Sequence, residues 1–192
     1  KTMMAGEILD TVKLSAFAKK FYSEPFTLNE IPEEYISRNN GVMLISSGKI
    51  RQSNEGCACT MNSILKQFIK HLTVGENEVV LLDMEAGVEH FGRGVDNSVD
   101  LILMIVDPSF ESLKLTKKIQ QLGDSIGKTV FFVLNKVNEL VLPTMLESID
   151  DQSKVLAVIS TDTEIARKGL VGDELMMEIP EIHMLARKIL KQ

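Results

Sequence analysis

The two cysteines of the chain, Cys57 and Cys59, are separated by a single residue in the segment NEGCACTMNS. Two thiols at this spacing are poor partners for a mutual disulfide, because an extended segment points them to opposite sides and a turn would strain the ring. In a reducing compartment, closely spaced cysteines bind metals or do redox chemistry more often than they serve structure. The spacing therefore leaves two interpretations open: a metal-binding pair, or two reduced thiols that only fill space.

A metal site built on this pair would need a second copy of the chain. Two sulfur atoms are half of the tetrahedral ligand set that Zn²⁺ prefers, and no histidine lies near Cys57 and Cys59 in the sequence. If two copies meet about a two-fold axis at this loop, the shared site has four thiolates. A helix that begins next to the pair would also lower the thiol pKa and favour the thiolate that binds metal.

Two further groups of residues have the chemistry of a nucleotide site. Asp83 ends the apolar run VVLLD, and a carboxylate at the carboxyl end of a parallel strand can hold Mg²⁺, while Gly87 would let the backbone approach a terminal phosphate. Asn135 and Lys136 end the run VLNKV, where an amide suits a purine edge and a lysine stem can lie over the ring. Taken alone, each group also has a structural explanation.

The glycine-rich phosphate loop that usually accompanies such residues, G-x-x-x-x-G-K-S/T, does not occur in the chain. Lys1 and Thr2, followed by the helical segment MMAGEIL, have the form of the tail of such a loop. We therefore expect the phosphate-loop region to be missing or truncated at the N-terminus, and we expect Lys1 and Thr2 to contact nucleotide.

The elements that must position these residues are five short apolar runs and the amphipathic segments between them. The runs are apolar at consecutive positions, which is typical of strands covered on both faces by helices, and their spacing leaves room for crossover helices. The sequence thus predicts an α/β fold with a mainly parallel sheet and helices on both faces. The predicted strands are 42–47, 79–84, 101–106, 130–135 and 155–160.

Apolar spacing also predicts the helices and the domain organisation. Thr60 is placed to cap a helix that runs to Leu72, and Pro180 opens a helix at the C-terminus. Two more helices are predicted over 3–21 and 111–126, and 22–41 is expected to be an irregular connection with a turn at NNG. A length of 192 residues favours one domain, 1–192.

Composition excludes several classes of partner. A formal net charge of -6 argues against nucleic acid, because a phosphate-binding surface needs clustered Lys and Arg. The longest apolar run, LILMIV, is far too short to span a membrane. The segment KTMMAGEILD lacks the apolar core and cleavage site of a secretory signal, so we expect a cytoplasmic protein.

Four segments in this order, GCACTMNSILK, DMEAGVEHFGRG, VDLILMIVDPSFESLKL and VLNKV, closely resemble the CooC-type accessory ATPases. That family serves nickel insertion into carbon monoxide dehydrogenase and acetyl-CoA synthase, and the resemblance covers about Asn40 to Lys136. It implies a P-loop NTPase-like fold of the MinD and nitrogenase iron protein class. It also implies a homodimer that forms around ATP and carries a metal, Ni²⁺ or Zn²⁺, at its interface, with a nickel enzyme as client.

The resemblance assigns roles to residues that match the family pattern. Cys57 and Cys59 match the metal-binding pair, and Asn135 matches the adenine-reading residue. Asp83 matches the Mg²⁺-linked acid and Glu85 to Gly87 the second switch, so the expected catalytic residues are Asp83, Glu85 and Gly87. The phosphate loop, its lysine and the first switch aspartate are not located in this chain.

Two other functions remain open at this point. One is a metal-binding interaction protein of the same fold that does not hydrolyse ATP, and the other is an electron-transfer relative that holds an iron-sulfur cluster between subunits. The hypothesis that the resemblance favours is a nucleotide-driven change in dimerisation that alters the metal affinity of Cys57 and Cys59.

Overall fold

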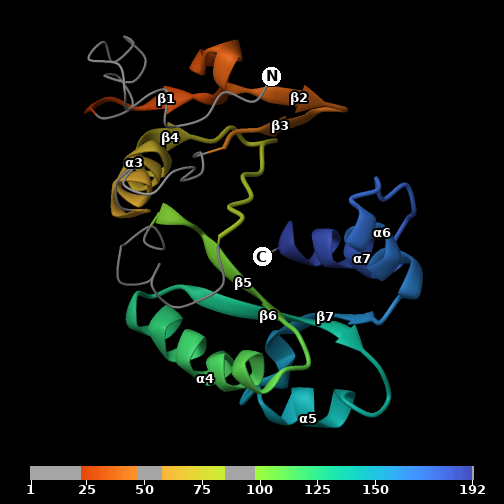
Figure 1. Ribbon diagram of the computed structural model, residues 1–192. Coiled ribbons are helices and arrows are strands. Elements are labelled where there is room, and N and C mark those ends of the chain that lie inside the picture. Colours follow the sequence, from red (N-terminus) through yellow and green to blue (C-terminus); the bar gives the residue numbers. More distant parts are fainter. Residues whose placement is uncertain (1–22, 47–57, 85–97, 192) are drawn as a thin grey trace. The chain divides into compact units, whose positions relative to one another are not determined.

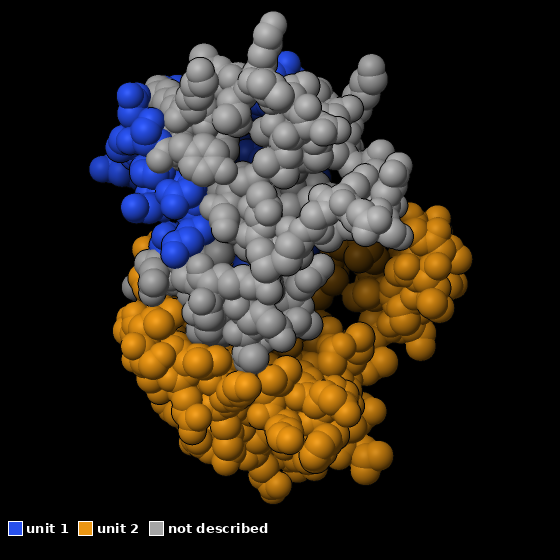
Figure 2. Space-filling model, turned by 60° about the vertical axis from the view of Figure 1, so that its left-hand side comes forward, with its two compact units in different colours: residues 1–98 blue, residues 99–192 orange. Residues whose placement is uncertain are grey.

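The computed structural model describes residues 23–46, 58–84 and 98–191, with side chains in the second range described from Leu65 onward. The chain divides into two compact units, Lys1–Ser98 and Val99–Gln192 (Figure 2). The single domain expected from the length of the chain stays a prediction.

The second unit is built on a three-stranded parallel sheet (Figure 1). Its strands β5 (Leu101–Val106), β6 (Thr129–Val137) and β7 (Val155–Ser160) lie in the order β5-β6-β7. The strands predicted at 101–106 and 155–160 are confirmed with the same bounds, and the one predicted at 130–135 is confirmed and extends to 129–137. Consecutive apolar residues form these strands because helices cover the sheet.

Four helices and one 3-10 turn connect or follow these strands. The predicted helix 111–126 is confirmed as α4 (Phe110–Ser125), which begins after Ser109, whose side chain accepts a hydrogen bond from the N–H of Ser112. The C-terminal helix is confirmed as α7 (Pro180–Ile189), with Pro180 in its first turn. The others are α5 (Leu142–Glu147), η5 (Gln152–Lys154) and α6 (Thr163–Val171).

The helices α4 and α7 cover opposite faces of the sheet. On β6, Val130 approaches Gly123 of α4, and the buried Val130 and Phe132 lie on the same face of the strand. On the opposite face, Val133 of β6 packs in one buried cluster with Leu156 of β7 and Leu185 of α7. The predicted α/β architecture with helices on both faces of a parallel sheet is confirmed in this unit.

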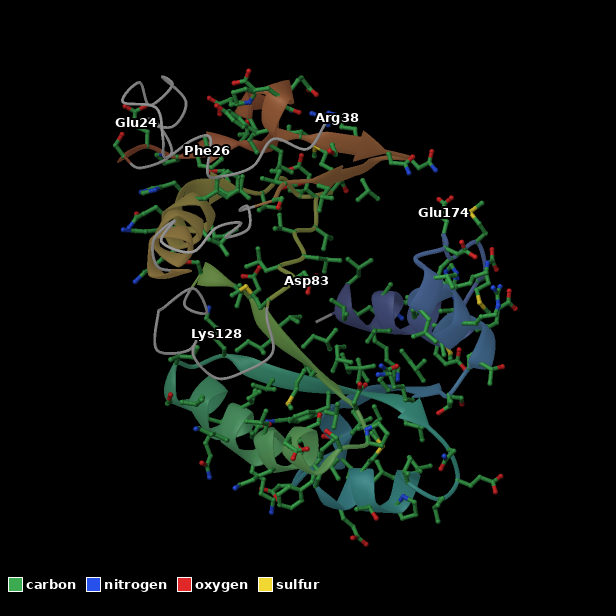
Figure 3. The ribbon with its side chains drawn as sticks, viewed as in Figure 1. Glu24, Phe26, Arg38, Asp83, Lys128 and Glu174 are labelled. Carbon is green, nitrogen blue, oxygen red and sulfur yellow. The ribbon has the colours of Figure 1, made fainter. Side chains whose placement is uncertain are left out.

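The first unit contains a smaller core around an aromatic pair. Strand β1 (Phe26–Thr27) runs parallel to β4 (Leu72–Thr73), which directly follows helix α3 (Ala58–His71). The ring of Phe26 lies 5.0 Å from that of Phe68 at 60°, and Figure 3 labels Phe26 on β1. The turns η1 (Leu28–Glu30) and η2 (Glu33–Tyr35) follow, and Leu28 and Ile31 complete the buried cluster.

The predicted turn at NNG joins two strands of an antiparallel hairpin, β2 (Ser37–Asn39) and β3 (Val42–Leu44). Asn40 (φ 46°) and Gly41 (φ 81°) form its two-residue loop, and positive φ at both positions is the geometry of a type I′ turn. The prediction of a buried parallel strand over 42–47 is therefore wrong. The short loop brings the partner strand back antiparallel, and Val42 and Leu44 remain exposed.

Two other predictions about elements need correction. Residues 79–84 form no strand, because no described segment pairs with their backbone, and Val79 and Leu81 are exposed. Helix α3 begins at Ala58, so Thr60 lies in its first turn and does not precede it as a cap. The helix predicted over 3–21 lies outside the described residues. Among the described helices, none has the length and apolar composition that a membrane crossing requires.

Candidate functional site

Three polar side chains meet at the carboxyl edge of the parallel sheet. Asp107 directly follows β5, and Asn135 and Lys136 lie near the end of the adjacent strand β6. Asn135 donates a hydrogen bond from Nδ2 to Oδ1 of Asp107 at 2.9 Å, and the Lys136 ammonium lies 2.6 Å from Oδ2. Both oxygens of one carboxylate are thus engaged by two successive residues of the next strand.

An irregularity in β6 allows both side chains to reach the same carboxylate. In a regular strand, Asn135 and Lys136 would point to opposite faces of the sheet. The pairing of β6 with β7 instead shifts register between Leu134 and Val137, and Lys136 has a positive φ of 56°. A bulge re-aims side chains in this way, and left-handed backbone at a residue other than glycine is often found at functional sites.

Hydrogen bonds fix the backbone of Asp107 as well as its side chain. Its N–H donates a hydrogen bond to Oγ of Ser112 at 3.1 Å, and its carbonyl oxygen accepts one from the N–H of Ser109 at 2.8 Å. Ser109 and Ser112 belong to the start of α4, so the first turn of this helix fixes the residue that follows β5.

The end of β6 is fixed by the turn that follows it. Oδ1 of Asn138 accepts hydrogen bonds from the N–H groups of Leu140 and Val141 at 3.0 and 3.1 Å. The carbonyl oxygen of Val137 accepts one at 2.9 Å from the N–H of Thr161, which follows β7. The backbone on both sides of the bulge is therefore anchored.

The cluster is open to ligand and offers mixed hydrogen-bonding chemistry. The Asp107 side chain is 40% exposed and that of Lys136 is 63% exposed. Oδ1 of Asn135 accepts no hydrogen bond from another described residue. A half-buried amide beside a lysine stem can bind the edge and face of a heterocyclic base, and the carboxyl edge of a parallel sheet is where such folds bind ligands.

Sequence reasoning placed Asn135 and Lys136 at this strand end but missed Asp107. A signal was present, because Asp107 directly follows the apolar run LILMIV. The same rule singled out Asp83, which ends the run VVLLD.

The other predicted site residues lie in the first unit or outside the described residues. Asp83, which Figure 3 labels, is exposed and does not end a strand of a described sheet. The backbone of Cys59 lies in the first turn of α3. The remaining predicted residues, Lys1, Thr2, Cys57, Glu85 and Gly87, lie outside the described residues.

The described residues include no group of three or more His, Cys, Asp or Glu side chains that could hold a metal ion. A pair of cysteines completed by a second chain would not form such a group within one copy. The roles of Cys57, Cys59, Asp83, Glu85 and Gly87 stay predictions.

A parallel sheet covered on both faces by helices, with its polar cluster at the carboxyl edge, defines an α/β protein of the P-loop NTPase-like class. No family model matches the chain. The chain is 40% identical over 170 residues to an uncharacterized ATP-binding protein of Methanocaldococcus jannaschii. This match covers 88% of this chain and 68% of that protein. The chain is also 32% identical over 146 residues to the carbon monoxide dehydrogenase accessory protein CooC of Rhodospirillum rubrum.

That second match covers 76% of this chain and 56% of CooC. Another uncharacterized ATP-binding protein of Methanocaldococcus jannaschii is 29% identical over 164 residues, which is 82% of this chain and 64% of that protein. The chain belongs to the CooC-like family of ATP-binding proteins. It spans between about half and two thirds of the length of these relatives.

Proposed function

We propose that the chain belongs to an ATP-dependent maturation factor that binds metal at a homodimer interface and assists nickel insertion into carbon monoxide dehydrogenase or acetyl-CoA synthase. Its similarity to a carbon monoxide dehydrogenase accessory protein and to ATP-binding proteins supports this role. The observation that carries the proposal is the half-buried Asn135 amide at the carboxyl edge of the sheet, held by Asp107.

In this proposal the second unit binds the base of ATP. The Asn135 amide hydrogen-bonds the edge of adenine, and the stem of Lys136 lies along its face. For the phosphates, the proposed residues are Lys1 and Thr2, which contact them, and Asp83, which holds Mg²⁺. ATP with Mg²⁺ closes the dimer through the segment Asp83 to Gly87, and hydrolysis of the terminal phosphate reopens it.

The metal in this proposal is cargo, carried by Cys57 and Cys59 of two copies. The backbone of Cys59 lies in the first turn of α3, where the positive end of the helix dipole favours a thiolate. Four thiolates suit Ni²⁺ and Zn²⁺ alike. A metal affinity that differs between the open and closed dimers would release nickel to the client enzyme.

Native mass spectrometry of anaerobic protein tests the proposal, because it reads metal content, bound nucleotide and oligomeric state together. With Ni²⁺ or Zn²⁺ added, we expect one metal per dimer, and chelation should remove the metal and the dimer together. The double substitution Cys57→Ala and Cys59→Ala should abolish metal binding. His183→Ala removes an exposed potential ligand on α7 and should leave one metal per dimer.

Two results would contradict the proposal in different ways. One metal per dimer in the double cysteine variant would show that other residues hold the metal. A wild-type protein that takes up neither metal nor ATP would contradict both halves of the proposed function.

A further inference from the structure

We propose that Asp107 is a positioning residue that fixes the orientation of the Asn135 amide and thereby makes the site select adenine over guanine. The inference rests on the proposed function, because it requires a nucleotide base at the carboxyl edge of β5 and β6. It goes further by assigning the choice of base to a residue that need not touch the base.

The orientation of the amide follows from the chemistry of its partner. An asparagine side chain can turn its oxygen or its nitrogen toward a given neighbour, and the two orientations are close in shape. An ionised carboxylate only accepts hydrogen bonds, so the Asn135 atom that faces Oδ1 of Asp107 at 2.9 Å must be the nitrogen. The amide oxygen of Asn135 is then directed away from Asp107, together with the second N–H of Nδ2.

Adenine and guanine differ in the groups that this amide would meet. On the edge that carries N7, adenine presents an N6 amino donor beside the N7 acceptor, whereas guanine presents the O6 and N7 acceptors. The free oxygen and N–H of Asn135 complement adenine, with the oxygen accepting from N6 and the N–H donating to N7. Against guanine the same oxygen would face O6, and two acceptors would repel each other.

Guanine could bind well only if the amide of Asn135 turned over. That rotation would place the amide oxygen against Oδ1 of Asp107, so the repulsion would move from the base to the carboxylate. Asp107 cannot easily yield, because Ser109 and Ser112 hold its backbone and the Lys136 ammonium lies 2.6 Å from its other oxygen. The charge-assisted contact with Lys136 also leaves that second oxygen without freedom to turn toward Asn135.

The test compares the affinities of ADP and GDP for the full chain by equilibrium titration with fluorescent derivatives of each. A bidentate contact between a side chain and a base typically discriminates by about 1–3 kcal/mol, which is about 5- to 150-fold in affinity, so we expect wild type to prefer ADP by at least about fivefold. The variants Asp107→Ala and Asp107→Leu differ in size, but both lack the hydrogen-bond acceptor. In each of them, the ratio of the affinity for ADP to the affinity for GDP should fall toward about one.

This affinity ratio distinguishes a positioning role from a merely structural one. If Asp107 were merely structural, its substitution would weaken the binding of ADP and of GDP equally. Asp150→Ala is the matched control, because Asp150 makes a comparable exposed ion pair with Lys117 at 3.1 Å on the same unit. It should leave both affinities unchanged. Circular dichroism of each variant confirms that the fold is retained.

The outcomes separate the inference from the function on which it rests. If wild type prefers ADP and both Asp107 variants keep that preference, the positioning role is wrong and the nucleotide site stands. If wild type binds ADP and GDP equally, the inference is also overturned. If wild type binds neither nucleotide, the proposed function fails and the inference fails with it.

Discussion

Replacing Gly123 by alanine tests the contact between α4 and β6 that supports the site. A methyl group on Gly123 would overlap the Cγ2 methyl of Val130 and lie 3.1 Å from the backbone oxygen of Lys128. Val130 is fully buried, and the N–H of Lys128 donates a 2.9 Å hydrogen bond to the carbonyl oxygen of Gly123. Neither neighbour can move away without disturbing the strand or the turn before it.

The magnitude follows from two opposing effects. Overpacking a core typically costs about 1–3 kcal/mol, whereas alanine favours a helix interior over glycine by about 1 kcal/mol. Because Val130 is fully buried and the Lys128 oxygen belongs to the backbone, we place the cost at Gly123 in the upper part of that range. The expected net effect of Gly123→Ala is a loss of about 1–2 kcal/mol in the free energy of unfolding.

Gly169 in α6 provides the matched control. It is exposed, and no atom lies within 4 Å of the position that a methyl group would take. Gly169→Ala should therefore gain about 0.5–1 kcal/mol from helix propensity alone. At about 2–4 °C per kcal/mol for a chain of this size, the two variants should melt roughly 3–12 °C apart, on opposite sides of wild type.

The assay is thermal and urea denaturation followed by circular dichroism at 222 nm, with both variants and wild type in one buffer. Equal stabilisation by the two substitutions would refute the close approach of α4 to β6. Such a result would also weaken the argument that the start of α4 fixes Asp107, because that argument depends on the helix packing tightly on the sheet.

Two further predictions concern hydrogen bonds that the structure defines. Asp162 accepts hydrogen bonds from two N–H groups of the first turn of α6, at 2.7 and 2.9 Å. Asp162→Ala should therefore lower the free energy of unfolding, measured by urea denaturation, by about 1 kcal/mol. Asp173→Ala, just beyond the far end of α6, should change that free energy little, because it removes only an exposed ion pair. The side-chain hydrogen bonds from Arg38 lower the pKa of Glu33, so the stability that this pair contributes is present at neutral pH and is lost as the pH falls through the folded-state pKa. Carboxyl-carbon NMR titration should show the pKa of Glu33 rising toward its ordinary value in Arg38→Met, and an unchanged pKa would contradict the ion pair.

The elements that could be predicted from the sequence are those whose signal is local. The strands at 101–106 and 155–160 and the helix opened by Pro180 are confirmed, because apolar runs and helix-start residues act over a few positions. Residues 79–84 carry the same kind of apolar run and form no strand. A strand exists only where another backbone pairs with it, and composition does not reveal whether a partner is present.

The sequence by itself determined the α/β class, the parallel sheet of the second unit and the place of Asn135 and Lys136 near a strand end. Only the tertiary structure decided that both residues meet Asp107, which lies 28 residues before Asn135. Regular alternation predicts opposite faces for two successive strand residues, and the bulge with left-handed Lys136 overrides it. The parallel pairing of β5 with β6 sets that contact, and such pairing depends on residues far apart in the chain.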